Sequence, residues 1–212
     1  MPPAAVPSDN ASFLNAHAAT GRIGLAGGTH PIDRTIRKAQ RGLARDAAGS
    51  AWSHAFLIGE RRSDGNFWVL ESDIDLRHKQ IRLGVQENRI DKFFDAAEWP
   101  NLAVLDFSLD AAATQRVVCA ALALLADSTQ YSLREIVGTG LALARPSLRT
   151  RENLLAREGA LYCSAFVQHC YAAAGVTLVP GLSGKNTTPH DIATTRVPHR
   201  AERLIRLPGA TH

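Results

Sequence analysis

Residues 52–58 read WSHAFLI and residues 67–71 read FWVLE, two β-prone stretches from which the rest of the fold can be built. The connection from Arg61 to Asn66 contains Asp64-Gly65, a pair typical of tight turns because both residues accept the left-handed backbone conformation. We therefore predict that the two stretches form an antiparallel hairpin.

His54 and Glu71 are equidistant from the centre of this turn, between residues 62 and 63. The hairpin is thus predicted to place them directly opposite each other on one face, about 5 Å apart at Cβ. A carboxylate there can accept a hydrogen bond from one imidazole nitrogen and leave the other nitrogen to face a nucleophile. The structural alternatives stay open: a strand histidine is more often structural, and Glu71 could be a solvent-facing strand end.

The remaining chain predicts an α+β fold, a small antiparallel sheet or half-barrel with helices packed on one side. Further strands are expected at 20–26, 81–85, 102–107, 176–179 and about 203–207, and helices at 35–45 (capped by Asp33), 111–127 (capped by Asp110), 133–144 and 165–174 (closed by Gly175). Residues 1–18 are expected to form a flexible N-terminal arm, and residues 19–212 a single domain.

Composition excludes several classes of protein. The 212 residues are 45% hydrophobic and 21% charged, which is close to the globular average and argues against a disordered chain, a collagen-like fibre or a coiled coil. The longest apolar run, Val117 to Ala126, is half of the roughly 20 residues that a membrane span needs. We therefore expect no transmembrane segment.

The chain is mildly basic, with a formal net charge of +4 and a pI of 9.2. Its basic clusters at 34–41 and 196–206 have no interleaved aromatic residues, so we expect no nucleic-acid partner. An anionic substrate or an anionic membrane surface stays open as a partner. Residues 1–13 have neither a basic region nor an apolar core typical of a Sec signal, so the expected location is the cytoplasm or a destination reached without that signal.

Cys163 is the cysteine whose position predicts chemistry. It begins an apolar helix, where the helix dipole favours a thiolate; the structural alternative is a small core residue. Cys119 and Cys170 lie in the middle of apolar helices and fit that alternative better. An odd number of cysteines argues against a disulfide framework, and no spacing typical of a metal site is present, so neither a metal nor another cofactor is expected.

A cysteine at a helix start, a strand histidine and a third polar group that orients it form an activated thiol. We therefore predict Cys163, His54 and Glu71 as catalytic residues. Tyr162 and Ser164, which flank Cys163, are predicted for the substrate pocket or the oxyanion site, where a backbone N–H at the helix start can also contribute. A tyrosine in an apolar pocket wall is the equally open alternative for Tyr162.

Three motifs carry a family resemblance: SHAFLIG at 53–59, VLES at 69–72 and YCSAFV at 162–167. In this order they resemble the permuted, YiiX-like branch of the NlpC-type papain superfamily, in which the histidine motif precedes the cysteine motif. Residues 20–26 and 33–38 resemble the opening segment of that branch, and residues 188–192 its turn after the cysteine helix, so the resemblance covers about residues 20–197.

The resemblance implies a papain-like catalytic domain with Cys163 as nucleophile, His54 as general base and Glu71 as orienting acid. Tyr162 corresponds to the tyrosine of the Tyr-Cys-Ser motif. The chain departs from some members at Ala165, where they have glutamate, and in its long Arg-containing insertion at 138–159.

The function expected from these features is a cysteine hydrolase, an amidase or peptidase that acts through an acyl-enzyme on a peptide or peptidoglycan-derived amide. Two alternatives stay open: a thiol acyltransferase or phospholipase acting on lipid esters, and a non-catalytic binding module on the same fold. The oligomeric state and the bond cleaved do not follow from the sequence.

Overall fold

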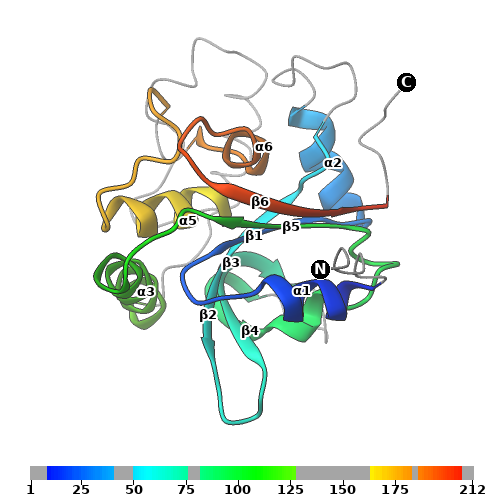
Figure 1. The fold of residues 1–212 in the computed structure, drawn as a ribbon. Coiled ribbons are helices and arrows are strands. Elements are labelled where there is room, and N and C mark those ends of the chain that lie inside the picture. The colour runs from blue at the N-terminus through cyan, green and yellow to red at the C-terminus, as the bar shows by residue number, and fades with distance from the viewer. Residues whose placement is uncertain (1–8, 41–49, 76–81, 128–162, 183–185, 207–212) are drawn as a thin grey trace, which may run out of the picture.

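An antiparallel sheet with strand order β4-β3-β2-β1-β5-β6 forms the centre of the molecule (Figure 1). The structure is a computed structural model that describes residues 9–40, 50–75, 82–127, 163–182 and 186–206. The strands are β1 (Ile23–Gly27), β2 (His54–Arg61), β3 (Phe67–Asp75), β4 (Arg82–Arg89), β5 (Asn101–Asp106) and β6 (Arg200–Ile205). The helices are α1 (Asn10–His17), α2 (Pro31–Ala39), the 3-10 helix η3 (Ile90–Phe93), α3 (Ala111–Ala126), α5 (Cys163–Ala172) and α6 (Pro189–Ala193).

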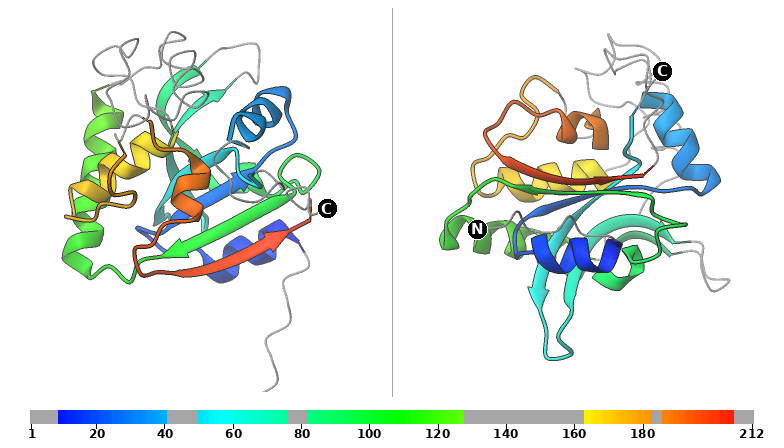
Figure 2. Two further views of the ribbon diagram at one scale, coloured as in Figure 1. Left: turned by 90° about the horizontal axis from the view of Figure 1, so that it is seen from above. Right: turned by 45° about the vertical axis from the view of Figure 1, so that its right-hand side comes forward.

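Helices cover both faces of the sheet, whereas the sequence predicted helices on one side. α5 packs against β2 and β3 and also contacts α3. α1 and η3 contact each other on the opposite side, where α1 also touches β5 and β6 (Figure 2). The prediction was wrong because it treated the segment that forms α1 as an arm and did not anticipate η3.

Alternation along β2 explains how one strand contributes to two apolar clusters. Ala55 and Leu57 pack in the cluster that includes Phe166 of α5, whereas Phe56 and Ile58 pack with η3 and α1. Successive side chains of a strand point to opposite faces. A strand buried on both faces needs a continuous apolar run, which residues 55–58 supply.

The β2–β3 hairpin forms as predicted, but its register differs from the prediction. Leu57 pairs with Leu70 and Ile58 with Val69, and the register shifts between Ile58 and Arg61. The turn is centred nearer to Gly65, whose φ is 79° and whose N–H donates to the carbonyl of Arg62. Extending the Leu57–Leu70 pairing places Asp73 opposite His54, and the prediction of Glu71 in that position was wrong by two residues.

Two predicted helices agree well with the structure. Asp110 caps α3, since its side chain accepts from the N–H of Ala113 at 2.7 Å. α5 begins at Cys163, and the chain turns at Gly175, where φ is 79°. None of the helices in the described ranges is long and apolar enough to cross a membrane.

Other predicted elements differ. α2 begins at Pro31, so Asp33 lies buried in its first turn and does not cap a later helix; the proline pre-sets the helical φ. Residues 176–179 form no strand, since they turn back toward α5 after Gly175. The helix predicted at 133–144 lies outside the described residues.

The arm predicted over residues 1–18 is wrong for Asn10–His17, which form α1. Asp9 caps this helix by accepting from the N–H of Ser12 at 2.7 Å. Phe13 and Leu14 are buried, and the side-chain amide of Asn10 donates to two backbone carbonyls at and after η3. Two apolar anchors and one buried amide thus dock α1.

Candidate active site

His54 is the first residue of β2, and its backbone is held on both sides. The N–H of Ser53 donates to the carbonyl of Ala26 at 2.9 Å, and the hydroxyl of Ser53 accepts from the N–H of Gly28 at 2.9 Å. The amide of Gln40 donates to the carbonyl of Trp52 at 3.0 Å. The end of β1 and the end of α2 therefore fix the chain that leads into His54.

The imidazole of His54 lies in an aromatic wall. Its ring centroid is 6.2 Å from that of Phe56, 6.1 Å from Phe93 and 6.3 Å from Trp99. The side chain is 7% exposed. Such burial restricts the ring to few orientations and increases the strength of any charge–charge contact that it makes.

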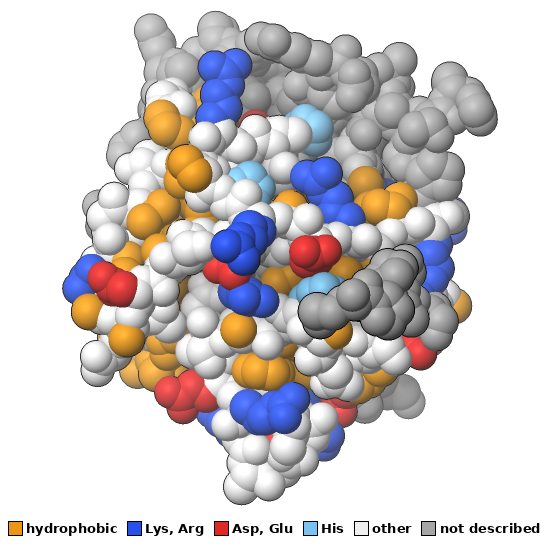
Figure 3. All heavy atoms as spheres, viewed as in Figure 1, with side chains coloured by type: hydrophobic (Ala, Val, Ile, Leu, Met, Phe, Trp, Pro, Cys, Tyr) orange, Lys and Arg blue, Asp and Glu red, His pale blue; other side chains and the backbone are white. Residues whose placement is uncertain are grey.

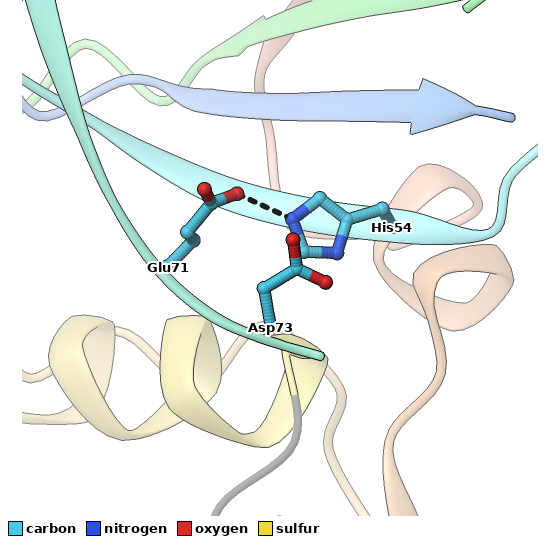
Figure 4. Close-up of side chains that lie close together, drawn as sticks. All are labelled: His54, Glu71 and Asp73. Carbon is cyan, nitrogen blue, oxygen red and sulfur yellow. Dashed lines mark hydrogen bonds and ion pairs between the residues drawn. The ribbon is translucent and has the colours of Figure 1, made fainter. Parts of the chain in front are cut away.

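His54 and Glu71 are in direct contact (Figure 4). Nε2 of His54 donates to Oε2 of Glu71 at 2.6 Å, because an ionised carboxylate can only accept. The Glu71 side chain is fully buried, at 0% exposure. Its other oxygen, Oε1, accepts from Nδ2 of Asn88 at 2.7 Å and from Nζ of Lys92 at 2.5 Å. All of these donors hold the carboxylate in one orientation.

Charge determines the protonation of this pair. Burial alone would raise the pKa of Glu71, but the Lys92 ammonium and the contact with His54 together hold that pKa below its usual value. Burial alone would lower the pKa of His54, but Asp73, a hydrogen bond with Cys163 and the contact with Glu71 hold that pKa well above its usual value. The pair therefore favours an imidazolium beside a carboxylate.

Cys163 completes a chain of three groups. It is the first residue of α5 and is 9% exposed. The Cys163 side chain lies near enough to His54 to contribute to the raised pKa of the imidazole. Because Nε2 of His54 is bonded to Glu71, Nδ1 is the ring nitrogen that remains available to the thiol. The structure thus brings the three predicted catalytic residues together in the order Glu71, His54, Cys163.

The two residues predicted for the substrate pocket or oxyanion site have different outcomes. Ser164 is buried, with its Oγ 3.7 Å from Sγ of Cys163. Tyr162 lies outside the described residues. The thiol therefore has at least one polar side-chain neighbour besides His54.

The other two cysteines lie in different environments. Cys170 is buried in the core, and burial raises the pKa of its thiol to about 12, so it is protonated and unreactive, in agreement with the sequence. Cys119 was expected in the core and is exposed. The reason is helical phase: the buried residues of α3 are Ala113, Val117 and Ala121, and Cys119 lies midway between two of them on the opposite side.

Sequence reasoning missed three polar residues at this site: Asp73, Asn88 and Lys92. Nζ of Lys92 lies 3.0 Å from Oδ2 of Asp73. Asp73 follows Glu71 by two residues, so strand periodicity could have indicated that both lie on one face. Lys92 has no such signal, since η3 must first fold back over the sheet.

His54, Glu71 and Asp73 also form the group that, among the described residues, could hold a metal ion (Figure 4). One ligand atom from each lies within 4.8 Å of the other two. The sequence predicted no metal site, because the three residues are not in a recognisable motif.

Basic side chains do not form one continuous area on the face shown in Figure 3. Lys and Arg side chains alternate there with Asp, Glu and apolar groups. A mixed surface of this kind offers no single strongly positive field.

A solved structure supports the fold. The chain is similar to the crystal structure of the metalloprotein yiiX from Escherichia coli O157:H7, DUF1105, with a TM-score of 0.55 and 12% identity. The match covers 88% of this chain and 97% of that one. No protein-family model and no curated protein matches the sequence. The predicted YiiX-like, papain-like α+β fold is thus confirmed, and this similarity concerns the fold alone.

Proposed function

We propose that this protein is a cysteine hydrolase, an amidase or peptidase that acts through an acyl-enzyme on Cys163. The observation that carries the proposal is the position of His54 between a buried carboxylate, 2.6 Å from its Nε2, and the thiol at the start of α5. A thiol, an imidazole and an orienting group in this order are the parts that nucleophilic catalysis requires.

The reaction follows from these contacts. Transfer of the Cys163 proton to Nδ1 of His54 gives a thiolate beside the imidazolium that the site favours, and Sγ attacks the carbonyl carbon of an amide. The tetrahedral intermediate collapses as the imidazolium gives that proton to the leaving amine, so the C–N bond breaks and a thioester remains. His54 then removes a proton from water, and hydroxide attacks the thioester carbon. The C–S bond breaks, the imidazolium returns its proton to Sγ, and the product leaves as a carboxylic acid that ionises in the solvent.

Glu71 acts on His54 and does not react. It accepts from Nε2, which places Nδ1 toward the thiol, and it stabilises the imidazolium that forms twice in the cycle. Its full burial keeps this contact free of competing water.

The start of α5 supplies groups for the developing oxyanion. The first N–H groups of a helix have no partner within the helix, and the dipole there favours negative charge. The backbone N–H of Cys163 belongs to this set, and Ser164 and Tyr162 are proposed as further contributors to the oxyanion site or the adjoining substrate pocket.

A metal does not fit the site as this chain builds it. The similar solved structure is described as a metalloprotein, and His54, Glu71 and Asp73 have suitable ligand atoms. However, the Lys92 ammonium already contacts both carboxylates, and Nε2 of His54 is already bonded to Glu71. A divalent cation would meet a positive charge within a few ångströms, so the proposed reaction uses no metal.

The substrate proposed is a peptide or a peptidoglycan-derived fragment, which rests on the motif resemblance and on the fold. The alternative of lipid esters is tested beside it. Purified protein is incubated with a peptide library, with peptidoglycan fragments and with acyl-labelled liposomes. Amide cleavage that is lost in Cys163→Ala supports the proposal; acyl release from liposomes without amide cleavage overturns it.

The nucleophile itself is tested first by alkylation of each cysteine across pH, measured by peptide mass spectrometry. Cys163 is expected to react faster below pH 8.5 than Cys119, which is exposed, and to slow in His54→Ala. Equal, slow reaction of Cys163 with and without His54 would favour a binding module.

A further inference from the structure

Lys92 is a buried cation that no step of the proposed reaction uses. Its side chain is 13% exposed, and its Nζ lies 2.5 Å from Oε1 of Glu71 and 3.0 Å from Oδ2 of Asp73. It comes from η3, a different element from the strand β3 that holds both carboxylates. Burying an ammonium is costly unless it is paired, so a lysine in this position is balanced by the two carboxylates.

We infer that Lys92 is a positioning residue that acts as the resident cation of the His54–Glu71–Asp73 cluster, holding Glu71 against His54 and excluding a divalent metal from the same place. The inference rests on the proposed function for its catalytic consequence. Its structural part, the occupation of the cluster by an ammonium, concerns only contacts among these four side chains.

Lys92 supplies positive charge to a cluster that holds two carboxylates. Glu71 and Asp73 lie within 4.8 Å of His54 and of each other at their ligand atoms. Two carboxylates so close cannot both stay ionised without positive charge nearby. The groups that face Glu71 are His54 from β2, Asp73 from β3, Asn88 from β4 and Lys92 from η3.

The two carboxylate oxygens of Glu71 accept from different donors. Lys92 and Asn88 both donate to Oε1, and His54 donates to Oε2. With Oε1 held by two donors, Oε2 stays directed at the imidazole. If Lys92 is removed, Oε1 keeps one neutral donor, and the carboxylate is free to turn or to take up another cation.

The same geometry explains how Lys92 excludes a metal. A metal bound by His54, Glu71 and Asp73 would lie among atoms that the ammonium of Lys92 already contacts. Removing the ammonium leaves two carboxylates and one imidazole, a donor set that suits zinc. Lys92 would therefore determine whether this cluster serves a thiol or holds a metal.

The test compares Lys92→Met with Lys92→Arg, which keeps the charge, and with Lys38→Met, which removes the same charge from an exposed position of α2. Zinc affinity is measured by competition with a fluorescent chelator, with every variant in a Cys163→Ala background so that this thiol contributes no ligand. We expect Lys92→Met to bind zinc at least tenfold more tightly than Lys38→Met. Equal zinc affinities of Lys92→Met and Lys38→Met would overturn the inference that Lys92 excludes a metal from the cluster.

A second readout follows the His54 ring by NMR on protein labelled with ¹⁵N-histidine, with the signal assigned by its loss in His54→Gln. The Nε2 proton bonded to Glu71 is expected in wild type, in Lys38→Met and in Lys92→Arg, and to be lost or shifted upfield in Lys92→Met. An unchanged signal in Lys92→Met would overturn the positioning role. If Lys92→Met does not fold, Lys92→Gln, which is neutral but keeps a donor, is measured against the same controls.

A third readout separates this inference from the proposed function. Alkylation of Cys163 is expected to slow about tenfold in Lys92→Met and to recover in Lys92→Arg. If Cys163 is unreactive in wild type, the proposed function fails, and the zinc and NMR readouts still decide on Lys92. If Cys163 is reactive and neither zinc binding nor the His54 signal responds to Lys92→Met, the inference alone fails.

Discussion

Nε2 of His54 donates to Oε2 of Glu71 at 2.6 Å although the strand pairing places a different residue opposite His54. The contact is diagonal across the hairpin, between residues that share a face of the sheet. A glutamate side chain is long enough to span this offset, which leaves the position opposite His54 to Asp73. Both carboxylates therefore lie beside one imidazole, and each has a separate effect on it.

Cys163→Ala is expected to abolish turnover and leave the fold intact. The side chain is small and nearly buried, so the loss in unfolding free energy should be about 1 kcal/mol or less. Steady-state rates and urea unfolding measure both effects. Cys119→Ala is the matched control, because it removes an exposed thiol from α3 and should change neither quantity. Turnover in Cys163→Ala that stays close to the wild-type rate would contradict the assignment.

His54→Ala should reduce kcat by about 10²–10⁴-fold, the usual contribution of general acid–base catalysis. Glu71→Gln should cost less, because an amide can still contact the ring while losing the negative charge that stabilises the imidazolium. Rates for the two variants at saturating substrate give this comparison.

Asp73→Asn is the control for Glu71. It neutralises the neighbouring carboxylate, which acts on the imidazole through its charge, whereas Glu71 accepts a hydrogen bond from Nε2. Asp73→Asn should therefore reduce the rate less than Glu71→Gln does. A larger effect of Asp73→Asn would mean that Asp73, the residue opposite in register, orients the imidazole.

The stability of the fold should depend on pH through His54 and Glu71. The pKa of His54 is raised in the folded state, so its contribution is fully present below the unfolded value of about 6.5 and is lost as pH rises through the folded value. The pKa of Glu71 is lowered, so its contribution is present above about 4.5 and is lost as pH falls through the folded value. The free energy of unfolding of wild type, measured with urea across pH, should therefore exceed that of His54→Gln by the largest amount between these two pH values.

The same measurement also tests whether the pKa of His54 is raised in the folded state. Above pH 6.5 the difference in unfolding free energy between wild type and His54→Gln should narrow steadily. A difference that stays constant from about pH 6 to pH 9 would show that the pKa of His54 in the folded protein is not raised above its unfolded value.

Asn10→Ala should destabilise the protein by about 2 kcal/mol, because it removes the side-chain donor that two buried carbonyls share. Nδ2 of Asn10 donates to the carbonyls of Phe93 and Trp99 at 2.8 and 2.9 Å. Gln115→Ala, at an exposed position of α3, is the control and should change stability by less than about 0.5 kcal/mol.

Asn10→Ala has a further consequence for the site. Since Phe93 ends η3, which also holds Lys92, loosening this contact should slow Cys163 alkylation modestly as well. Loss of stability with an unchanged alkylation rate would show that α1 supports the fold without supporting the site.

Local sequence determined the parts of this protein that depend on short spacing. The Asp64-Gly65 turn and its flanking apolar runs predicted the hairpin, and the cap at Asp110 predicted α3, since both depend on interactions within a few residues. His54 and Glu71 could be placed on one face by strand alternation, and Cys163 at a helix start by the apolar run that follows it.

Tertiary structure alone decided the register, the docking of α1 and the cation of the site. The register shifts by one residue between Ile58 and Arg61. Beyond this shift the pairing differs by two residues from the predicted one, which keeps His54 and Glu71 on one face but changes which residue lies opposite His54. The contact of Lys92 with Glu71 joins residues 21 apart through a 3-10 turn. Such contacts depend on how whole elements pack, because burial and charge balance are properties of the assembled sheet and not of any one segment.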